Sequence, residues 1–284
     1  MGMILSHSRP DLDVTVTAGA ILSDTARLTN NRPRSVTRFQ WPSGAQTTAT
    51  TMGIQTTWAQ SFSPRVVGLM NTTLPAGTKV EFQIYDGAGF VLPSAPNTQR
   101  VVQLPNGSRH AWIVLPAGLD SIDRVRPLVY NDVNGVASIA ADSTWDLGEY
   151  WVGPAEDFVI KAGHANPRED STKVNWTRRF QPFIRSGSSR RNFNFTPKLS
   201  QQIETYGDPG DSTALDLDAL FSKIDRGQPA VCIERWQDSA GAYSPYLVHR
   251  TVKFGVITKL PGEKHMAGQY FDFDTGVLAE IAMA

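Results

Sequence analysis

Nucleophilic catalysis would depend on one residue, because the chain has a single cysteine. Cys232 can in principle pair with His249 or His265 as a thiol nucleophile and its base. It lies, however, inside the apolar run Ala-Val-Cys-Ile, where a thiol normally packs as a small buried side chain. A reactive cysteine needs a helix N-terminus or cationic neighbours instead. The sequence therefore predicts a buried Cys232, no intrachain disulfide and folding in a reducing compartment.

Glycan hydrolysis would require two carboxyl groups on either side of the scissile bond, about 5–9.5 Å apart. Glu149 with Glu156 or Asp157 is one such pairing, and Asp272 with Asp274 is another. The second pair alternates with two phenylalanines, which is typical of the solvated face of a strand. The sequence therefore does not predict a hydrolase.

Metal ligands are equally sparse. The five histidines are scattered, and none stands at zinc-ligand spacing from another histidine or from the cysteine. Asn131-Asp132 followed by Asn134-Gly135 has the oxygen-rich composition of a calcium loop, but it lacks the twelve-residue pattern and the closing glutamate. An ordinary turn is the favoured interpretation, and we expect no metal or other cofactor.

Arginine is densest in one stretch, whose members are candidates for a subunit interface: Arg178, Arg179, Arg185, Arg190 and Arg191. Phosphate contact is the alternative interpretation. The chain has 27 basic and 27 acidic residues, whereas a nucleic-acid-binding protein usually has a basic excess. Arginine is enriched in protein interfaces, where it pairs bidentately with carboxylates. We therefore favour pairing with acidic residues of this chain or of a neighbouring one.

Aromatic side chains can stack on sugars, although most aromatics of a β-sandwich belong to its core. Trp145 and Trp151 fall on one face of a strand over 145–152 and are expected to anchor the core, whereas Tyr150 falls on the other face. The candidate glycan contacts are Tyr130, Asn131 and Tyr150.

The elements that would position these residues are mostly short strands. Residues 79–86 alternate with period two, with Val80, Phe82 and Ile84 on one face and polar residues and Tyr85 on the other. Residues 65–70 suit a strand covered on both faces. Residues 101–104 and 112–115, around Asn106-Gly107, predict a hairpin. About eight strands with regular turn signals indicate a sandwich or jelly roll.

The second half adds one helix to further strands. Residues 213–226 place Leu217, Leu220, Phe221 and Ile224 on one apolar stripe, with Asp211 or Ser212 as the cap. Strands are expected over 176–184, 191–195, 230–236, 246–260 and 269–278. The predicted fold is mainly β, an N-terminal jelly-roll β-sandwich followed by a second β domain with one packed α-helix.

Length favours two domains, because single cores rarely grow beyond about 250–300 residues. With 284 residues, we expect a lead-in over 1–20, a jelly-roll domain over 21–155, a connection over 156–175 and a second β domain over 176–284. No stretch approaches the roughly 20 apolar residues of a membrane span, so membrane insertion is not expected.

Four runs resemble minor tail proteins of tailed bacteriophages: 31–39, 65–69, 79–82 and 147–154, the last reading Leu-Gly-Glu-Tyr-Trp-Val-Gly-Pro. The first part is similar to a discoidin, or galactose-binding-like, jelly roll. The remainder is similar to the β domain of phage tail-tip and distal tail proteins.

The resemblance implies a non-enzymatic component of a phage tail tip or baseplate, made in the bacterial cytoplasm and located in the virion tail. Its partners would be tail-tube, distal-tail and hub proteins, with copies of the chain forming a symmetric ring. The alternative hypothesis is a carbohydrate-binding module that attaches to host-surface glycan, with its site in the loops at one end of the sandwich. Neither hypothesis involves nucleic acid.

Overall fold

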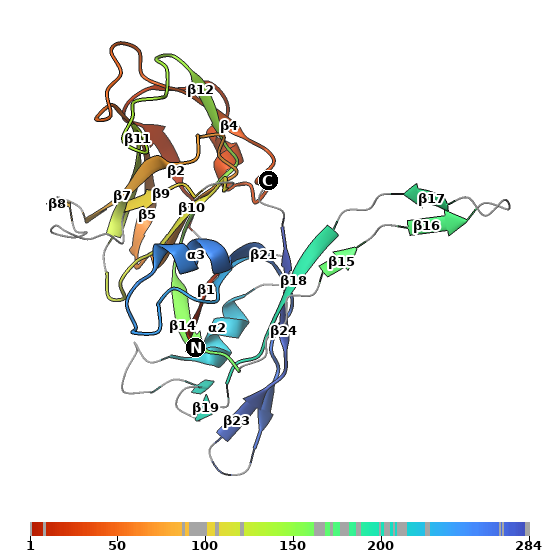
Figure 1. Ribbon diagram of the computed structural model, residues 1–284. Helices are drawn as coiled ribbons and strands as arrows, with labels where there is room; N and C mark the ends of the chain where they lie inside the picture. Colours follow the sequence, from red (N-terminus) through yellow and green to blue (C-terminus); the bar gives the residue numbers. More distant parts are fainter. Residues whose placement is uncertain are drawn as a thin grey trace. The chain divides into compact units, whose positions relative to one another are not determined.

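The chain folds mainly into β-structure (Figure 1). The computed structural model describes residues 2–7, 10–86, 89–90, 101–105, 108–119, 122–161, 168–170, 173–176, 182–185, 189–198, 200–201, 205–206, 208, 215–224, 228–266, 268 and 270–281. Two compact units divide the chain. We call residues 4–156, 233–252 and 283–284 the sandwich unit, and residues 1–3, 157–232 and 253–282 the sheet unit.

The sandwich unit contains two main antiparallel sheets. The larger has the strand order β2–β5–β11–β7–β8, with β9 also on β7, and the smaller has the order β10–β6–β13. The chain passes repeatedly between the two sheets, as in a jelly roll, although β7, β8 and β9 follow one another within the larger one. The larger sheet comprises β2 (Asp13–Val16), β5 (Thr51–Phe62), β7 (Thr78–Asp86), β8 (Gly89–Phe90), β9 (Val101–Gln103) and β11 (Ile122–Val133). The smaller comprises β6 (Val66–Met70), β10 (Ala111–Val114) and β13 (Glu149–Gly153).

The core of the sandwich lies between these sheets. Val80, Phe82 and Ile84 of β7 are fully buried in it, and the strand alternates between buried and half-buried residues along its length. This confirms the period-two prediction for 79–86. Every residue of β6 is buried. Val67 and Leu69 face the sandwich core, and the residues on the opposite face of the strand are covered as well. The prediction of a strand covered on both faces is therefore also confirmed.

The aromatic-rich segment 144–153 forms two strands rather than one. β12 (Thr144–Leu147) pairs with β4 (Thr37–Gln40) in a small sheet with β3 (Ala20–Ile21), whereas β13 pairs with β6. Gly148 makes the break, since a Cβ at this position would lie 1.8 Å from the carbonyl oxygen of Pro33. Trp145 and Tyr150 belong to the sandwich core, and the prediction that Trp151 shares it with Trp145 is wrong.

The hairpin predicted around Asn106-Gly107 is also wrong. β9 pairs with β7 in the larger sheet, and β10 pairs with β6 in the smaller one, so the connection crosses from one sheet to the other. A two-residue hairpin does occur at Asn134-Gly135, where both residues have positive φ and Val133 and Val136 exchange backbone hydrogen bonds.

A helix covers the outer face of β10, in place of the first part of the strand predicted over 246–260. α3 (Pro245–Thr251) lies beside β10, and β21 (Val252–Lys259) begins only after it (Figure 1). The Ser244 side chain caps α3 by accepting a hydrogen bond from Leu247 N, and Pro245 occupies the first turn. The Nε2 atom of His249 then accepts a hydrogen bond from the backbone N–H of Trp112 at 3.2 Å.

Burial at this joint lowers the pKa of two histidines. The rings of His110 and His249 stack with centroids 6.1 Å apart. Burial, and secondarily the charge of His249, lowers the pKa of His110 to about 4, and burial also lowers the pKa of His249. Both imidazoles are therefore neutral in the folded protein near neutral pH.

A seven-stranded sheet with the order β14–β1–β20–β21–β24–β18–β15 contains most of the sheet unit's strands. Besides β21 it comprises β1 (Gly2–His7), β14 (Ala155–Val159), β15 (Arg168–Asp170), β18 (Ser189–Phe195), β20 (Pro229–Ile233) and β24 (Gly276–Glu280). Two further sheets are β16 (Lys173–Trp176) with β17 (Pro182–Arg185), and β19 (Ser200–Gln201) with β23 (Tyr270–Phe273) and β22 (Glu263–His265).

The helix predicted over 213–226 is present in shorter form as α2 (Leu217–Lys223), with Leu217, Leu220 and Phe221 buried as the apolar stripe indicated, and Ile224 follows the helix as its C-cap. Its cap is Asp216, which accepts a hydrogen bond from Ala219 N at 2.7 Å. The predicted caps Asp211 and Ser212 lie outside the described residues.

The two units follow limits that differ from the predicted domains at both ends. Residues 2–7, expected in a lead-in, form the buried strand β1, because Met-Ile-Leu supplies a continuous apolar run. Residues 233–252, expected in the second domain, belong to the sandwich unit. Among the described residues, no helix has both the length and the apolar character needed to cross a membrane.

Candidate functional site

Two of the three candidate glycan contacts are buried and do not lie on the surface. Tyr150 is fully buried in the sandwich core, and its hydroxyl shares a hydrogen bond of 3.2 Å with Thr56. Burial raises the pKa of this phenol well above its usual range. Asn131 is also fully buried, and its amide bonds to the backbone of Ile139 at 2.7 and 2.8 Å. The predictions for Tyr150 and Asn131 are therefore wrong, because both side chains hold the sandwich together from inside.

Tyr130 remains half-exposed, on the side of the larger sheet that faces away from the core. Val125 and Val129 of β11 point into the core, so the residues between them in the period-two pattern point outward. We call this surface the Tyr85–Tyr130 face. It consists of Lys79, Glu81, Gln83 and Tyr85 of β7, Arg124, Arg126, Leu128 and Tyr130 of β11, and Thr51, Gly53, Gln55 and Thr57 of β5.

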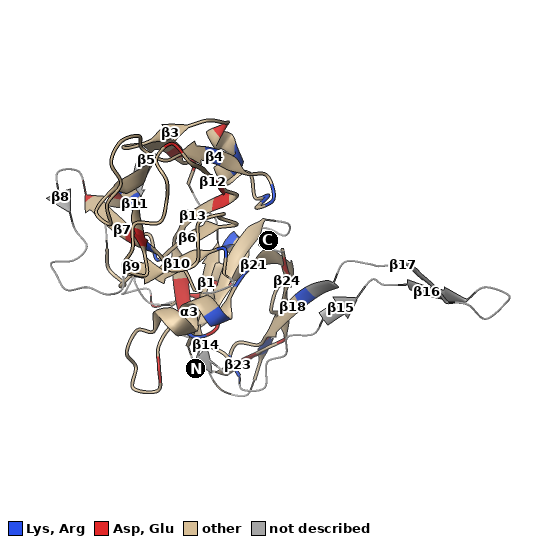
Figure 2. Cartoon of the chain, turned by 45° about the horizontal axis from the view of Figure 1, so that its top comes forward, with Lys and Arg blue, Asp and Glu red and all other residues tan. Residues whose placement is uncertain are grey.

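The register of the strands brings these side chains into rows across the sheet. Arg124 lies opposite Tyr85 on β7 and opposite Thr57 on β5, and Arg126 lies opposite Gln83. Tyr130 lies at the far end of the face, opposite Thr51. Most of the sandwich ribbon is tan in Figure 2, with basic and acidic positions both present on β7 and β11.

Hydrogen bonds hold the β7 side of the face in one arrangement. The Tyr130 hydroxyl donates to Glu81 Oε2 at 2.8 Å, and the Tyr85 hydroxyl donates to Gln83 Oε1 at 2.8 Å. Gln83 Nε2 in turn donates to Glu81 Oε1 at 3.4 Å. Each ring also has a cation above it. Lys79 Nζ lies 4.7 Å from the Tyr130 centroid, and the Arg124 guanidinium carbon lies 4.4 Å from the Tyr85 centroid.

The side chains of the two arginines of β11 make no hydrogen bond or ion pair with other described residues. The Nε atoms of Arg124 and Arg126 are buried and make no hydrogen bond within the described part of the chain. A buried donor left without an acceptor typically costs about 1–3 kcal/mol. A Cβ added at Gly53 would lie 2.2 Å from Thr17 Oγ1 and 3.0 Å from Arg126 Nε. The missing side chain of Gly53 therefore leaves room for both Thr17 and Arg126.

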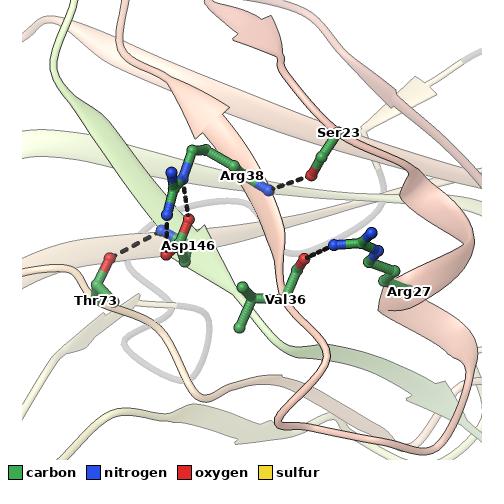
Figure 3. Close-up of polar contacts among 6 residues, drawn as sticks. All are labelled: Ser23, Arg27, Val36, Arg38, Thr73 and Asp146. Carbon is green, nitrogen blue, oxygen red and sulfur yellow. Dashed lines mark hydrogen bonds and ion pairs between the residues drawn. The ribbon is translucent and has the colours of Figure 1, made fainter.

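A second polar group lies on the small sheet of β3, β4 and β12 (Figure 3). Arg38 of β4 makes a bidentate ion pair with Asp146 of β12, with distances of 2.8 and 3.1 Å. Ser23 Oγ accepts from Arg38 N and Thr73 Oγ1 accepts from Asp146 N, both at 2.8 Å. These donors and acceptors satisfy one another, so the group stabilises the sheet and presents no unused polar atom comparable to those on β11.

The remaining candidates give no catalytic arrangement among the described residues. Cys232 is buried, as predicted. Asp272 is bonded to Lys161, and Asp274 to Lys264 at 2.7 Å, which lowers the pKa of both carboxyl groups. Glu149 is fully buried, whereas Glu156 and Asp157 are exposed. No cluster of three metal-ligating side chains occurs within the described ranges.

The predicted arginine interface is described only in part. Arg178 and Arg179 lie outside the described residues. Arg185 ends β17, and Arg190 and Arg191 lie in β18, opposite Glu169 and Arg168 of β15. Arg191 is exposed. The structure thus brings Arg190 and Arg191 to one strand and leaves the partner of this stretch as a prediction.

Sequence reasoning missed Tyr85, Arg124 and Arg126. The signal was available on β7, where alternation placed Lys79, Glu81, Gln83 and Tyr85 on one face. Polar residues on a strand usually indicate only solvent exposure. What distinguishes this face is the set of neighbours on β11, and register across strands is not readable from a single sequence.

No family model and no curated protein matches the chain. Several solved structures are similar to about half of the chain. A mutant lectin-binding domain of lectinolysin complexed with Lewis b is 11% identical, with a TM-score of 0.37 over 52% of this chain and 97% of that one. A module described as GH31 CBM32-2 bound to GalNAc is 12% identical, with a TM-score of 0.36 over 52% and 99%. A structure of reduced XRCC1 bound to the DNA pol beta catalytic domain is 13% identical, with a TM-score of 0.32 over 53% and 99%. Several of these neighbours are carbohydrate-binding modules, but similarity at this level assigns no ligand to this chain.

Proposed function

We propose that the sandwich unit is a non-catalytic carbohydrate-binding module, and that glycan binds on the Tyr85–Tyr130 face. The observation that carries the proposal is the pair of half-exposed tyrosines held at opposite ends of one rigid sheet, with planar polar side chains between them. A sugar ring offers an apolar C–H face that packs on an aromatic ring, and hydroxyl groups that bond to amides, carboxylates and guanidinium groups. The face provides both kinds of contact.

The spacing of the tyrosines favours a chain of sugars over a single one. Tyr85 and Lys79, which contacts the Tyr130 ring, are six residues apart on β7. At about 3.3 Å per residue this separation is roughly 20 Å. One monosaccharide cannot reach both rings, whereas an extended oligosaccharide can. Affinity should therefore rise with chain length until the ligand spans the face.

Preorganisation supports binding at this position. The face lies on β7 and β11, which are joined to each other and to β5 within the larger sheet, and sites on such elements hold their geometry better than sites on loops. The hydrogen bonds of Tyr85 and Tyr130 fix both phenol rings before ligand arrives, which reduces the entropy lost on binding.

The test is calorimetric titration of the intact protein with soluble polysaccharides and with an oligosaccharide series of increasing length. Tyr85→Ala and Tyr130→Ala should each weaken binding at least tenfold, because each removes one stacking platform. Tyr246→Ala is the matched control, since Tyr246 is exposed on α3 beside β10 of the smaller sheet. Equal affinities for the wild type and both face variants would refute this location of the site.

We propose a second role, assembly into a phage tail, on the basis of the sequence resemblance and one feature of the sheet unit. β16 and β17 pair only with each other among the described strands. An isolated two-stranded hairpin is marginally stable in water, so a partner that adds a strand or a packing surface would stabilise it. Light scattering of the intact protein, alone and mixed with tail-tube, distal-tail and hub proteins, tests this role. A strict monomer that binds none of them would exclude it.

A further inference from the structure

The Tyr85–Tyr130 face has two cationic groups that nothing in the described protein neutralises. Arg124 and Arg126 are two residues apart on β11 and therefore project from the same side, about 7 Å apart along the strand. Each has a buried Nε without an acceptor, and neither forms an ion pair within the described ranges. Buried polar groups are nearly always hydrogen-bonded in native proteins, so two adjacent exceptions on one face need an explanation.

The acidic residues nearest in the strands do not provide it. Glu81 engages its two oxygens with Tyr130 and Gln83. Asp13, on β2 at the edge of the sheet, makes no ion pair with either arginine, and Asp123 has a buried Oδ1 that is itself without a hydrogen-bond partner. No acidic side chain of the described residues pairs with either guanidinium group, so the terminal nitrogens of both are available to an acceptor on a ligand.

A carboxylate is the acceptor that fits these donors. The guanidinium group is a planar fork whose N–H groups match the two oxygens of a carboxylate, and a charged acceptor forms the stronger hydrogen bonds. Arg124 also stacks on the Tyr85 ring, so its guanidinium plane is already oriented beside the surface on which a sugar would pack. Lys79 adds a third positive charge at the other end of the face.

We propose that Arg124 and Arg126 bind the carboxylates of a polysaccharide containing uronic acids. This inference rests on the proposed function, and it adds the ligand class. The tyrosines supply stacking that any suitable sugar can use, and the arginines supply selection for the acidic form. Nucleic acid is the less favoured polyanion, because the chain as a whole has zero net charge.

The experiment compares two forms of one polymer, so that only the charge of the sugar differs. Polygalacturonate and its fully methyl-esterified form are titrated into the intact protein by calorimetry, at low and at high salt. The wild type should bind the acid form at least tenfold more tightly, and added salt should reduce this preference. Arg124→Gln with Arg126→Gln should abolish the preference. Tyr130→Ala should weaken the binding of both forms, because Tyr130 contacts Lys79 and Glu81 and neither arginine.

Two further variants keep the test decisive. Arg126→Lys keeps the charge and removes the fork, so it should lose part of the preference. Arg109→Gln is the control, because Arg109 is exposed in the loop before β10. Unfolding curves establish that each variant is folded.

The two proposals fail in different ways. Equal affinity for both polymers, unchanged by the arginine variants, would overturn the uronic-acid inference and leave glycan binding intact. Absence of binding to either polymer would overturn this inference, and absence of binding to the wider panel as well would overturn the proposed function. Equally tight binding of dextran sulfate would show that charge alone, not the carboxylate, is recognised.

Discussion

Mild acid should destabilise the sandwich unit through the histidine pair at the joint between α3 and β10. The Nε2 atom of His249 accepts a hydrogen bond from Trp112 N, and its Nδ1 lies 2.8 Å from the carbonyl oxygen of Pro245, to which it donates. A proton on Nε2 would place two donors against each other. The folded protein therefore stabilises the neutral form of His249, and His110 stacks beside it in a similarly buried position.

The sign and size of the effect follow from the shift of His110. Its pKa falls from the ordinary 6.5 to about 4 in the folded protein. The unfolded chain therefore takes up a proton as the pH falls through 6.5, while the folded chain does not until the pH approaches 4. At one pKa unit per 1.36 kcal/mol, the loss of stability reaches about 2 kcal/mol at roughly pH 5 and about 3 kcal/mol below pH 4. His249 has a pKa lowered in the same direction and adds to this loss.

The assay is urea denaturation followed by tryptophan fluorescence, from about pH 7.5 to about pH 5. Six of the seven tryptophans lie in the sandwich unit, because only Trp176 falls outside it, so the signal reports this unit. His110→Gln should remove about 2 kcal/mol of the pH dependence, whereas His265→Gln should leave it unchanged, since His265 is exposed on β22. A pH dependence that is the same in both variants would refute the reasoning.

Four further predictions concern the sandwich core, the buried tyrosines and the buried thiol. Gly68→Ala should destabilise the protein by about 3 kcal/mol or more, because the new Cβ would lie 2.0 Å from the Trp112 ring; thermal melting measures this, and an unchanged melting temperature would contradict it. Tyr150→Phe should cost about 1 kcal/mol through the lost hydrogen bond to Thr56, measured by urea denaturation, where a gain in stability would count against the assignment. Burial raises the pKa of Tyr150 above its usual range and the pKa of Tyr243 to about 12. The free energy of unfolding should therefore fall above about pH 10, where the unfolded chain ionises these two tyrosines and the folded protein does not. The tyrosinate absorbance of the folded protein at about pH 11 should stay below that of the unfolded chain. Cys232 should react with a thiol reagent only as the protein unfolds, and rapid labelling of the folded protein would contradict its burial.

The local sequence pattern was sufficient to predict an element where the periodicity of that element alone determines which of its side chains are buried. Alternation over 79–86 predicted β7, and the continuous apolar run at 66–70 predicted a strand covered on both faces. The apolar stripe of α2 was likewise legible. In each case the periodicity of the element itself determines which side chains are buried.

The local sequence pattern was insufficient where contacts with residues far away in the chain determine where a strand ends or which strand it pairs with. Gly148 divides the aromatic segment because the carbonyl of Pro33 approaches it, and no local signal reveals that approach. The residues around Asn106-Gly107 connect two sheets, although Asn-Gly favours a hairpin. α3 was missed for a different reason. Its Ser244-Pro245 start is a helix signal, but Tyr246, Val248 and Thr251 favour a strand.

The candidate site shows the same division. Tyr130 was singled out from sequence, and the structure leaves it half-exposed, while Tyr150 and Asn131 are buried by residues far away in the chain. Arg124 and Arg126 become candidate binding residues only because they lie opposite Tyr85 and Gln83, on a strand about forty residues earlier in the sequence. Cross-strand register, not residue type, assembles this surface.

The most direct test of the account is to map the bound ligand by nuclear magnetic resonance, with backbone amides followed during titration by polygalacturonate oligosaccharides. We predict that the largest shifts fall on β7 and β11, around Tyr85, Arg124, Arg126 and Tyr130. Shifts confined to another surface, such as the Arg38–Asp146 group of Figure 3, would contradict the central claim.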